Sequence, residues 1–326
     1  MNALPRKAWL FLILVSINGL ATAGDSGQAR EWLERMSAAM SQMSYQGTFV
    51  YVRDGEVETM RITHVTDDSG IRERLYSVSG PHREVIRDRK GVRCVLRDTA
   101  SVFEDQVVAS SYFPDLPLSV IDNNNVGYRL QTGGQARIAG HTARRVTISP
   151  ADNFRYGYDF WLEENTGLLL KWKLIDADHQ TIAKLMFTDF AIGSAVNMSE
   201  LESDSQPTDF VEMKTFSQKN TVVTGSHPRW QPARLPPGFQ LASHSHTTGD
   251  GGIYEHTVYS DGLAAVSVYV EQQGAETAVN PGESKLGTNN AFTRRQGTLQ
   301  ITVIGEVPAV TVKAIANEMA RSVAAQ

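Results

Sequence analysis

The sequence predicts an α+β protein whose strands form antiparallel sheets, with a helix near each end. Over most of the chain, large apolar residues recur at every second position in short runs, and Gly, Asn, Asp and Pro separate the runs. This pattern is typical of antiparallel strands joined by tight turns. Apolar residues at helical spacing occur near the start and at the end. The chain of 326 residues suits two domains better than one.

The first 23 residues have the pattern of an export signal. Residues 6 and 7 are basic, and Ala8–Val15 is an unbroken apolar run. The small residues in Ala21–Ala23 fit a cleavage site, and the apolar run is too short to cross a bilayer core of about 30 Å. We therefore expect cleavage near Ala23 and a soluble, exported chain that begins at Gly24, where a lipid anchor would require a cysteine.

The net charge argues against a general attraction to nucleic acid or to anionic membranes. It is −5 for the whole chain and −7 without the signal, which carries two basic residues and no acid. An acidic chain repels phosphate backbones over its surface as a whole. No nucleic-acid partner is therefore expected.

Cys94 is the only cysteine, so it cannot close a disulfide within the chain. Val92, Cys94 and Leu96 alternate with their neighbours as strand residues do, which places the thiol on an inward face as a small hydrophobic group. A redox or nucleophilic role is the alternative, but the neighbouring charges do not form a pattern that stabilises a thiolate.

We expect the first domain over residues 24–200. Trp32, Leu33 and Met36 begin an apolar stripe at helical spacing, which predicts a helix over Gln28–Met43. Asp54-Gly55 predicts a hairpin turn. The expected strands are Gly47–Arg53, Val57–Val65, Ile71–Ser79, Arg83–Asp88, Val92–Asp98, Val102–Val107, Gly127–Gln131, Gln135–Ile138, Thr142–Ser149 and three more within Tyr156–Phe190.

Residues 201–225 are expected to form a linker, because much of this stretch is rich in Ser, Asp, Glu and Gln. A second domain over residues 226–326 is expected to be a smaller antiparallel sheet packed by a terminal helix, which Pro308 opens. Its expected strands are Phe239–His246, Ile253–Tyr259, Ala264–Glu271, Asn290–Arg295 and Leu299–Gly305.

The three strands of Tyr156–Phe190 carry the strongest apolar signal. Alternation predicts that one face is lined by large apolar side chains, and this face has two interpretations. It is either an ordinary core covered by the first helix, or a hollow for a lipid-like ligand, because one short helix covers only part of a wide sheet. The candidate lipid-binding residues are Phe160, Leu162, Leu170, Trp172 and Met186.

A basic strip lies between Arg72 and Arg97. This span holds eight Lys or Arg residues against three acids. Guanidinium groups bind phosphate in bidentate fashion, so adjacent strands could form a phosphate site. The alternative is a solvated face whose charges pair locally. The candidate phosphate-binding residues are Arg72, Arg74, Arg83, Arg87 and Arg93.

Enzyme motifs were not found in the sequence, so we expect a protein that is not an enzyme and needs no cofactor. His244 and His246 share a strand face, and His256 could lie on a paired strand, which would bring three imidazoles together for zinc or copper. The alternating Ser and Thr residues indicate an exposed edge instead. We therefore predict no metal site.

Several motifs together resemble the RseB or MucB family of periplasmic regulators, which restrain the sigma-E-type envelope-stress response. The resemblance covers nearly the whole mature chain. It rests on Tyr45–Tyr51, Ile138–His141 with Arg144-Arg145, Pro150 with Arg155–Tyr158, Trp161-Leu162 with Thr166–Lys171, Leu235–Phe239 and Val258–Leu263.

The resemblance implies a first domain like that of lipoprotein carriers, a curved half-open antiparallel β-barrel with helices in its concavity, followed by a smaller α/β domain. It implies binding to the periplasmic segment of a transmembrane anti-sigma factor and protection of that segment from regulated proteolysis. Mislocalised lipoprotein or lipopolysaccharide would release it. A homo-oligomer is compatible with these expectations, and the motifs assign no individual functional residue.

Two other functions compete with this reading. One is a periplasmic lipid or lipoprotein carrier without a regulatory partner, although such a carrier gives no reason for the second domain. The other is an exported hydrolase whose site is assembled only in space, since carboxylate pairs of that kind leave no sequence motif.

Overall fold

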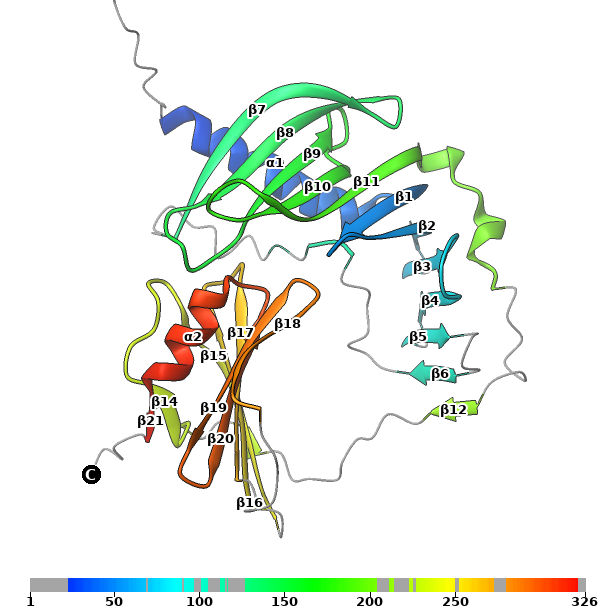
Figure 1. Ribbon diagram of the computed structural model, residues 1–326. Helices are drawn as coiled ribbons and strands as arrows, with labels where there is room; N and C mark the ends of the chain where they lie inside the picture. Colours follow the sequence, from blue (N-terminus) through cyan, green and yellow to red (C-terminus); the bar gives the residue numbers. More distant parts are fainter. Residues whose placement is uncertain are drawn as a thin grey trace, which may run out of the picture.

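The computed structural model describes residues 23–68, 70–89, 91–96, 101–104, 112–114, 116, 127–203, 211–213, 223–224, 227–249, 252–272 and 280–321. These residues form two β-rich domains (Figure 1). The expected export signal lies outside them except for Ala23, and so does much of the expected linker. Among the helices of the described part, none has the length and apolar character needed to span a membrane.

The first domain begins with helix α1 (Ala23–Gln42), which starts earlier than the expected Gln28–Met43. Its strands and short 3-10 helices then follow in chain order. They are β1 (Tyr45–Arg53), β2 (Glu56–Asp67), β3 (Gly70–Ser77), β4 (Arg83–Asp88), β5 (Gly91–Leu96), β6 (Ser101–Glu104), β7 (Tyr128–Ile138), β8 (His141–Pro150), β9 (Gly157–Glu163), β10 (Leu169–Ile175), β11 (Thr181–Ile192), η3 (Gly193–Ala195), η4 (Met198–Leu201) and β12 (Val211–Met213).

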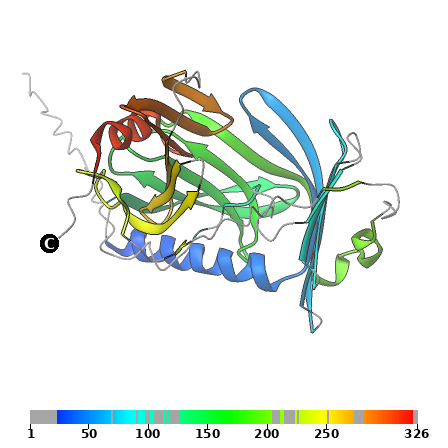
Figure 2. The same ribbon diagram turned by 90° about the horizontal axis from the view of Figure 1, so that it is seen from below.

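One sheet contains all twelve of these strands, in the order β12-β6-β5-β4-β3-β2-β1-β11-β10-β9-β8-β7. Its pairs are antiparallel except that β12 runs parallel to β6. The sheet bends strongly, so that β3–β6 turn away from β7–β10 (Figures 1 and 2). The predicted antiparallel architecture is confirmed, and the sheet does not close on itself. A half-open barrel with helices in its concavity stays a prediction.

Helix α1 packs on one face of this sheet, which we call the inner face. Its buried stripe includes Ala29, Leu33 and Met36, which are at most 3% exposed. Their spacing of four and three residues places them on one side of the helix. Burial of a side chain such as Leu33 contributes about 1.5–3 kcal/mol, so packing rather than helix propensity holds α1 in place.

The β1–β2 hairpin has the turn that its sequence predicts. Asp54 and Gly55 both have positive φ, 52° and 82°, as a two-residue turn of this kind requires. The expected strands Gly127–Gln131 and Gln135–Ile138 differ from the prediction, because they form the single strand β7. A register shift between Thr132 and Gln135 absorbs the two glycines that had suggested a turn.

Helix η4 docks against the outer face of the sheet, the face opposite α1. The Arg61 guanidinium donates hydrogen bonds of 2.6 and 2.9 Å to the two carboxylate oxygens of Glu200. These bonds hold the pKa of Glu200 below its usual value. Arg74 also donates to the Glu200 carbonyl oxygen, at 3.2 Å. The chain leaving the first domain is thus fixed to that domain through residue 200.

The second domain is built on a seven-stranded sheet in the order β13-β15-β16-β17-β20-β19-β18. Val312, Ile315 and Ala316 of its helix α2 are fully buried against this sheet, and a two-stranded sheet of β14 and β21 flanks the helix. The elements are β13 (Val223–Thr224), β14 (Trp230–Pro232), β15 (Gln240–Gly249), β16 (Gly252–Ser260), β17 (Ala265–Gln272), β18 (Gly282–Leu286), β19 (Asn289–Gln296), β20 (Leu299–Gly305), α2 (Ala309–Glu318) and β21 (Met319–Arg321).

Candidate functional site

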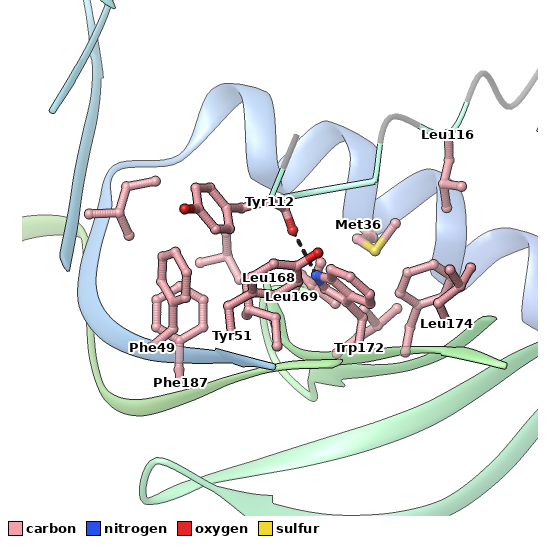
Figure 3. Close-up of a cluster of buried hydrophobic side chains, with 14 of the residues drawn as sticks. Met36, Phe49, Tyr51, Tyr112, Leu116, Leu168, Leu169, Trp172, Leu174 and Phe187 are labelled. Carbon is pink, nitrogen blue, oxygen red and sulfur yellow. Dashed lines mark hydrogen bonds between the residues drawn. The ribbon is translucent and has the colours of Figure 1, made fainter. Parts of the chain in front are cut away.

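A continuous set of buried side chains, here called the apolar cluster, occupies the space between α1 and the inner face (Figure 3). The Phe49 ring contacts the rings of Phe187 and Tyr112 at centroid distances of 5.4 and 5.6 Å. The Trp172 indole N–H donates a 2.9 Å hydrogen bond to the Tyr112 carbonyl oxygen (Figure 3). The cluster includes Met36, Phe49, Tyr51, Tyr112, Leu116, Phe160, Leu162, Leu168, Leu169, Trp172, Leu174 and Phe187.

Three of the five predicted lipid-binding residues lie in the apolar cluster. Phe160 and Leu162 of β9 are fully buried, and Trp172 of β10 is 5% exposed. The protein's own side chains cover all three. An acyl chain would therefore reach them only if α1 or the cover formed by Tyr112 and Leu116 moved away from the sheet.

The prediction for Leu170 is wrong. The pairing of β10 with β9 shifts between Leu169 and Lys171, so a bulge interrupts the alternation there. Leu169 takes the inward position, and Leu170 packs on the outer face against Trp161. A single extra residue in one strand thus reversed the face expected from simple alternation.

The prediction for Met186 is also wrong. On β11 the inward positions belong to Leu185 and Phe187, which are buried in the apolar cluster. Met186 lies between them in sequence and therefore points to the outer face, where it is 41% exposed. Its cross-strand partner on β10 is Lys171.

The five predicted phosphate-binding arginines do not share one face. Strand alternation and register place Arg83 and Arg87 on the inner side, in line with buried Val85, and Arg72, Arg74 and Arg93 on the outer side. The basic strip is therefore divided between the two surfaces of the sheet.

Local pairing, the alternative considered from the sequence, describes most of these arginines. Arg72 pairs with Asp67 at 2.5 Å, Arg93 with Asp88 at 3.4 Å, and Arg74 with Glu84 in a nearly buried contact. Arg83 donates a 2.8 Å hydrogen bond to the Tyr112 hydroxyl. Each of these contacts engages one nitrogen of its guanidinium with a neighbouring side chain of the same domain.

The three histidines of the second domain do not converge. His244 Nδ1 lies 3.0 Å from the Thr257 hydroxyl on the α2 side of the sheet. His256 lies on the other side, where its ring stacks on that of Tyr269 at 4.4 Å. Within the described residues, no group of three or more His, Cys, Asp or Glu side chains could hold a metal ion.

The two domains meet at a buried arginine. Arg155 is completely buried, and its guanidinium donates a 2.5 Å hydrogen bond to Asp261 of the second domain and 3.1 Å bonds to Asp152 of the first. It also donates to the carbonyl oxygen of Pro237. We call this contact, with the residues around it, the domain junction.

Aromatic rings enclose the arginine from both domains. Its Cζ lies 5.2 Å from the ring centre of Tyr128 and 5.3 Å from that of Phe239, both within cation–π range. The Tyr128 hydroxyl donates a 3.1 Å hydrogen bond to Asp261, and burial holds the pKa of Tyr128 well above its usual value.

The turn that contains Asp261 fixes the orientation of its carboxylate. One carboxylate oxygen accepts hydrogen bonds of 3.0 and 2.8 Å from the backbone N–H groups of Leu263 and Ala264. The other oxygen is left to accept from Arg155 and Tyr128. The carboxylate is therefore oriented by the second domain and satisfied by the first.

Further polar contacts extend the domain junction. Thr311 donates a 2.6 Å bond to the Phe154 carbonyl oxygen, and the Asn290 amide donates a 3.0 Å bond to the Tyr156 hydroxyl. A cleft of about 270 Å³ lies beside these contacts. It is lined by Tyr128, Tyr156, Tyr158, Leu263, Ala264, Ala265, Asn289 and Glu306.

Sequence reasoning did not select Arg155 or Asp261 as site residues. Both occur in motifs that carry the family resemblance, and Pro237 and Phe239 occur in a third. The presence of these residues in three motifs of the family resemblance was the signal in the sequence that could have indicated a site. Only the fold shows that the three motifs lie together.

Comparison with known proteins identifies close relatives along the whole chain. The MucB/RseB N-terminal domain matches residues 28–205, and the MucB/RseB C-terminal domain matches residues 224–320. The sigma factor AlgU regulatory protein MucB of Pseudomonas aeruginosa is 31% identical, with 98% of this chain and 99% of that protein covered. The sigma-E factor regulatory protein RseB of Escherichia coli K12 is 25% identical, with 96% and 98% covered.

Solved structures agree with these relatives. A crystal structure of MucB in complex with MucA(peri) has a TM-score of 0.68 and 27% identity, and the Pseudomonas aeruginosa MucA/MucB complex has 0.69 and 28%. Both cover 91% of this chain and 100% of the matched chain. A crystal structure of MucB has a TM-score of 0.60 over 91% of this chain.

Proposed function

The chain belongs to the MucB/RseB family, and from this membership we propose that it is a periplasmic regulator that binds the periplasmic segment of a transmembrane anti-sigma factor. The observation that carries the proposal is the likeness over 91% of the chain to MucB bound to MucA(peri). The relatives at 31% and 25% identity are both named as sigma factor regulatory proteins. We further propose that binding shields the anti-sigma segment from regulated proteolysis.

The proposed domains are residues 24–200 and 226–326, joined by residues 201–225 and preceded by a signal that is cleaved near Ala23. The ranges matched by the two family domains support this division. The domain junction gives the division a function, because it fixes the angle between the two parts that would grip the partner. The higher TM-scores to the two MucA-bound structures support the view that this arrangement is the gripping state.

We propose that lipid-type signals, such as mislocalised lipoprotein or lipopolysaccharide, act through the apolar cluster. The Trp172 indole is hydrogen-bonded to the backbone of Tyr112 and buried, so an acyl chain that reaches Trp172 must displace this contact. Tyr156 belongs to the same cluster and follows Arg155 directly, so a shift of its backbone moves the arginine of the domain junction. A lipid that favours the opened form releases the partner only by its difference in affinity for the two forms.

The test is a titration of the mature protein bound to a purified anti-sigma periplasmic segment. Added lipopolysaccharide is expected to lower the affinity for the segment, and Arg155→Met is expected to lower it without lipid. Unchanged segment affinity at saturating lipid would exclude the coupling, while lack of binding to any anti-sigma segment would exclude the regulatory function. A lipid carrier without a regulatory partner would bind lipid but not the segment, and a hydrolase would turn over ester, peptide or glycoside substrates.

A further inference from the structure

A cluster of cations lies on the outer face of the twelve-stranded sheet, away from both the apolar cluster and the domain junction. Cross-strand partners place Arg145 on β8, Trp161 on β9, Lys171 on β10 and Met186 on β11 in one row. Directly opposed residues in such a row have side chains that project from the same face. The row thus presents two cations, an indole and an exposed thioether side by side.

A second row runs parallel to the first. It contains Asp159 on β9, Lys173 on β10 and Lys184 on β11, each the partner of the next. We call Arg145, Lys171, Lys173 and Lys184 together the cationic patch. The two rows carry four positive charges, and Asp159 is the acid they contain.

Asp159 does not neutralise the lysines. Arg145 donates hydrogen bonds of 2.7 and 2.8 Å to its two oxygens, and Thr147 donates one of 2.7 Å. The carboxylate is 5% exposed and satisfied by these contacts. In the part of the chain that the structure describes, no carboxylate lies within ion-pair distance of Lys171, Lys173 or Lys184.

Trp161 holds the cations close together. The Lys171 ammonium lies 4.2 Å from the indole centre, the Lys173 ammonium 5.9 Å, and the Arg145 guanidinium carbon 5.6 Å. Partial burial, with repulsion from Lys173 and Lys184, lowers the pKa of Lys171. The arrangement therefore brings like charges together, and an external anion bound there would reduce the repulsion between them.

The surface around the patch is broad and partly apolar. Met186 is 41% exposed, and Val57, which pairs with Val52 at the same face, is 61% exposed. The cations spread over β8–β11 at about 4.8 Å per strand, so they form an extended array. Such an array is complementary to a membrane surface, where a layer of anionic headgroups lies above the apolar acyl chains.

We propose that the cationic patch, with Met186, docks the protein on the anionic phospholipid headgroups of a membrane surface. The overall charge of the chain is negative, so the contact is local and sets the orientation of the molecule. It requires neither the apolar cluster nor an anti-sigma partner. The outer face of β8–β11 would lie against the membrane while the domain junction stays free.

The experiment measures co-sedimentation of the mature protein with phosphatidylcholine vesicles that contain or lack phosphatidylglycerol. We expect binding only to the vesicles that contain phosphatidylglycerol, and weakening by salt. Each lysine near an anionic surface strengthens binding about five-fold, so the variant combining Lys171→Gln, Lys173→Gln and Lys184→Gln should bind on the order of a hundred-fold more weakly. Thermal denaturation of each variant verifies its fold.

A matched control removes three exposed cations elsewhere: Arg137→Gln, Arg234→Gln and Lys313→Gln. It should bind the anionic vesicles within a few-fold of the unchanged protein. Equal weakening of the control and the patch variant would overturn the proposal, since net charge alone would then govern binding. Equal binding to both kinds of vesicle would overturn it too, as would tighter patch-dependent binding of polyglutamate, which would assign the surface to an acidic protein.

Discussion

Asp261→Asn is the sharpest test of the domain junction. The substitution keeps the size of the side chain and the oxygen that its turn requires, but it removes the charge that faces Arg155 and turns an acceptor into a donor. Loss of one partner from a buried ion pair costs about 3–5 kcal/mol. Because Asp152 still pairs with the arginine, we expect the lower end, about 3 kcal/mol.

This cost should appear in thermal denaturation followed by near-ultraviolet circular dichroism. For a chain of about 300 residues, about 3 kcal/mol corresponds to a fall in Tm of roughly 5 °C. Small-angle X-ray scattering below the transition would show whether the domains separate before they unfold. The control is Lys313→Gln, which breaks the exposed pair of Lys313 with Glu283 and should cost less than about 1 kcal/mol. If the two variants melt together, the junction does not hold the domains as argued here.

Three further predictions concern single side chains. Trp172→Phe leaves the Tyr112 carbonyl without its buried donor and should lower the free energy of unfolding by about 1–3 kcal/mol in urea titrations. Glu200 has a lowered pKa in the folded chain, so its stabilisation is present above its usual value of 4.5 and is lost as the pH falls through the folded value. Glu200→Gln should therefore reduce the loss of stability on acidification, measured by denaturation between neutral and acid pH. Burial raises the pKa of the Cys94 thiol, so alkylation should be slow in the native protein and accelerate with denaturant; fast native alkylation would contradict its burial.

The strands were predictable because burial on one face leaves a period of two in the sequence. The hairpin at Asp54-Gly55 and the stripe of α1 followed from equally local rules. Leu170 was not predictable in this way, because a bulge depends on the partner strand and changes the face without changing the local pattern. The same holds for Met186. Its neighbours in sequence are also apolar, so either face of the strand is possible for it until the pairing with β10 and β1 fixes the register.

Less of the site than of the fold could be predicted from the sequence. Arginines close in sequence suggested a strip, but alternation divided them between two faces. Arg155 and Asp261 are separated by 106 positions, and nothing in the local pattern of either one names the other. Charge clusters such as the cationic patch arise in the same way, because Arg145 and Lys171 become neighbours only through the pairing of β8, β9 and β10.

The strands β12 and β13 limit how far the two domains can move apart. β12 is tied to β6 of the first sheet and β13 to β15 of the second, so the stretch between the sheets runs only from Met213 to Val223. Ten residue steps reach at most about 35 Å when fully extended. If the domain junction opens while both strands stay paired, this short segment keeps the second domain near the first. The junction can then form again once the lipid that opened it has left.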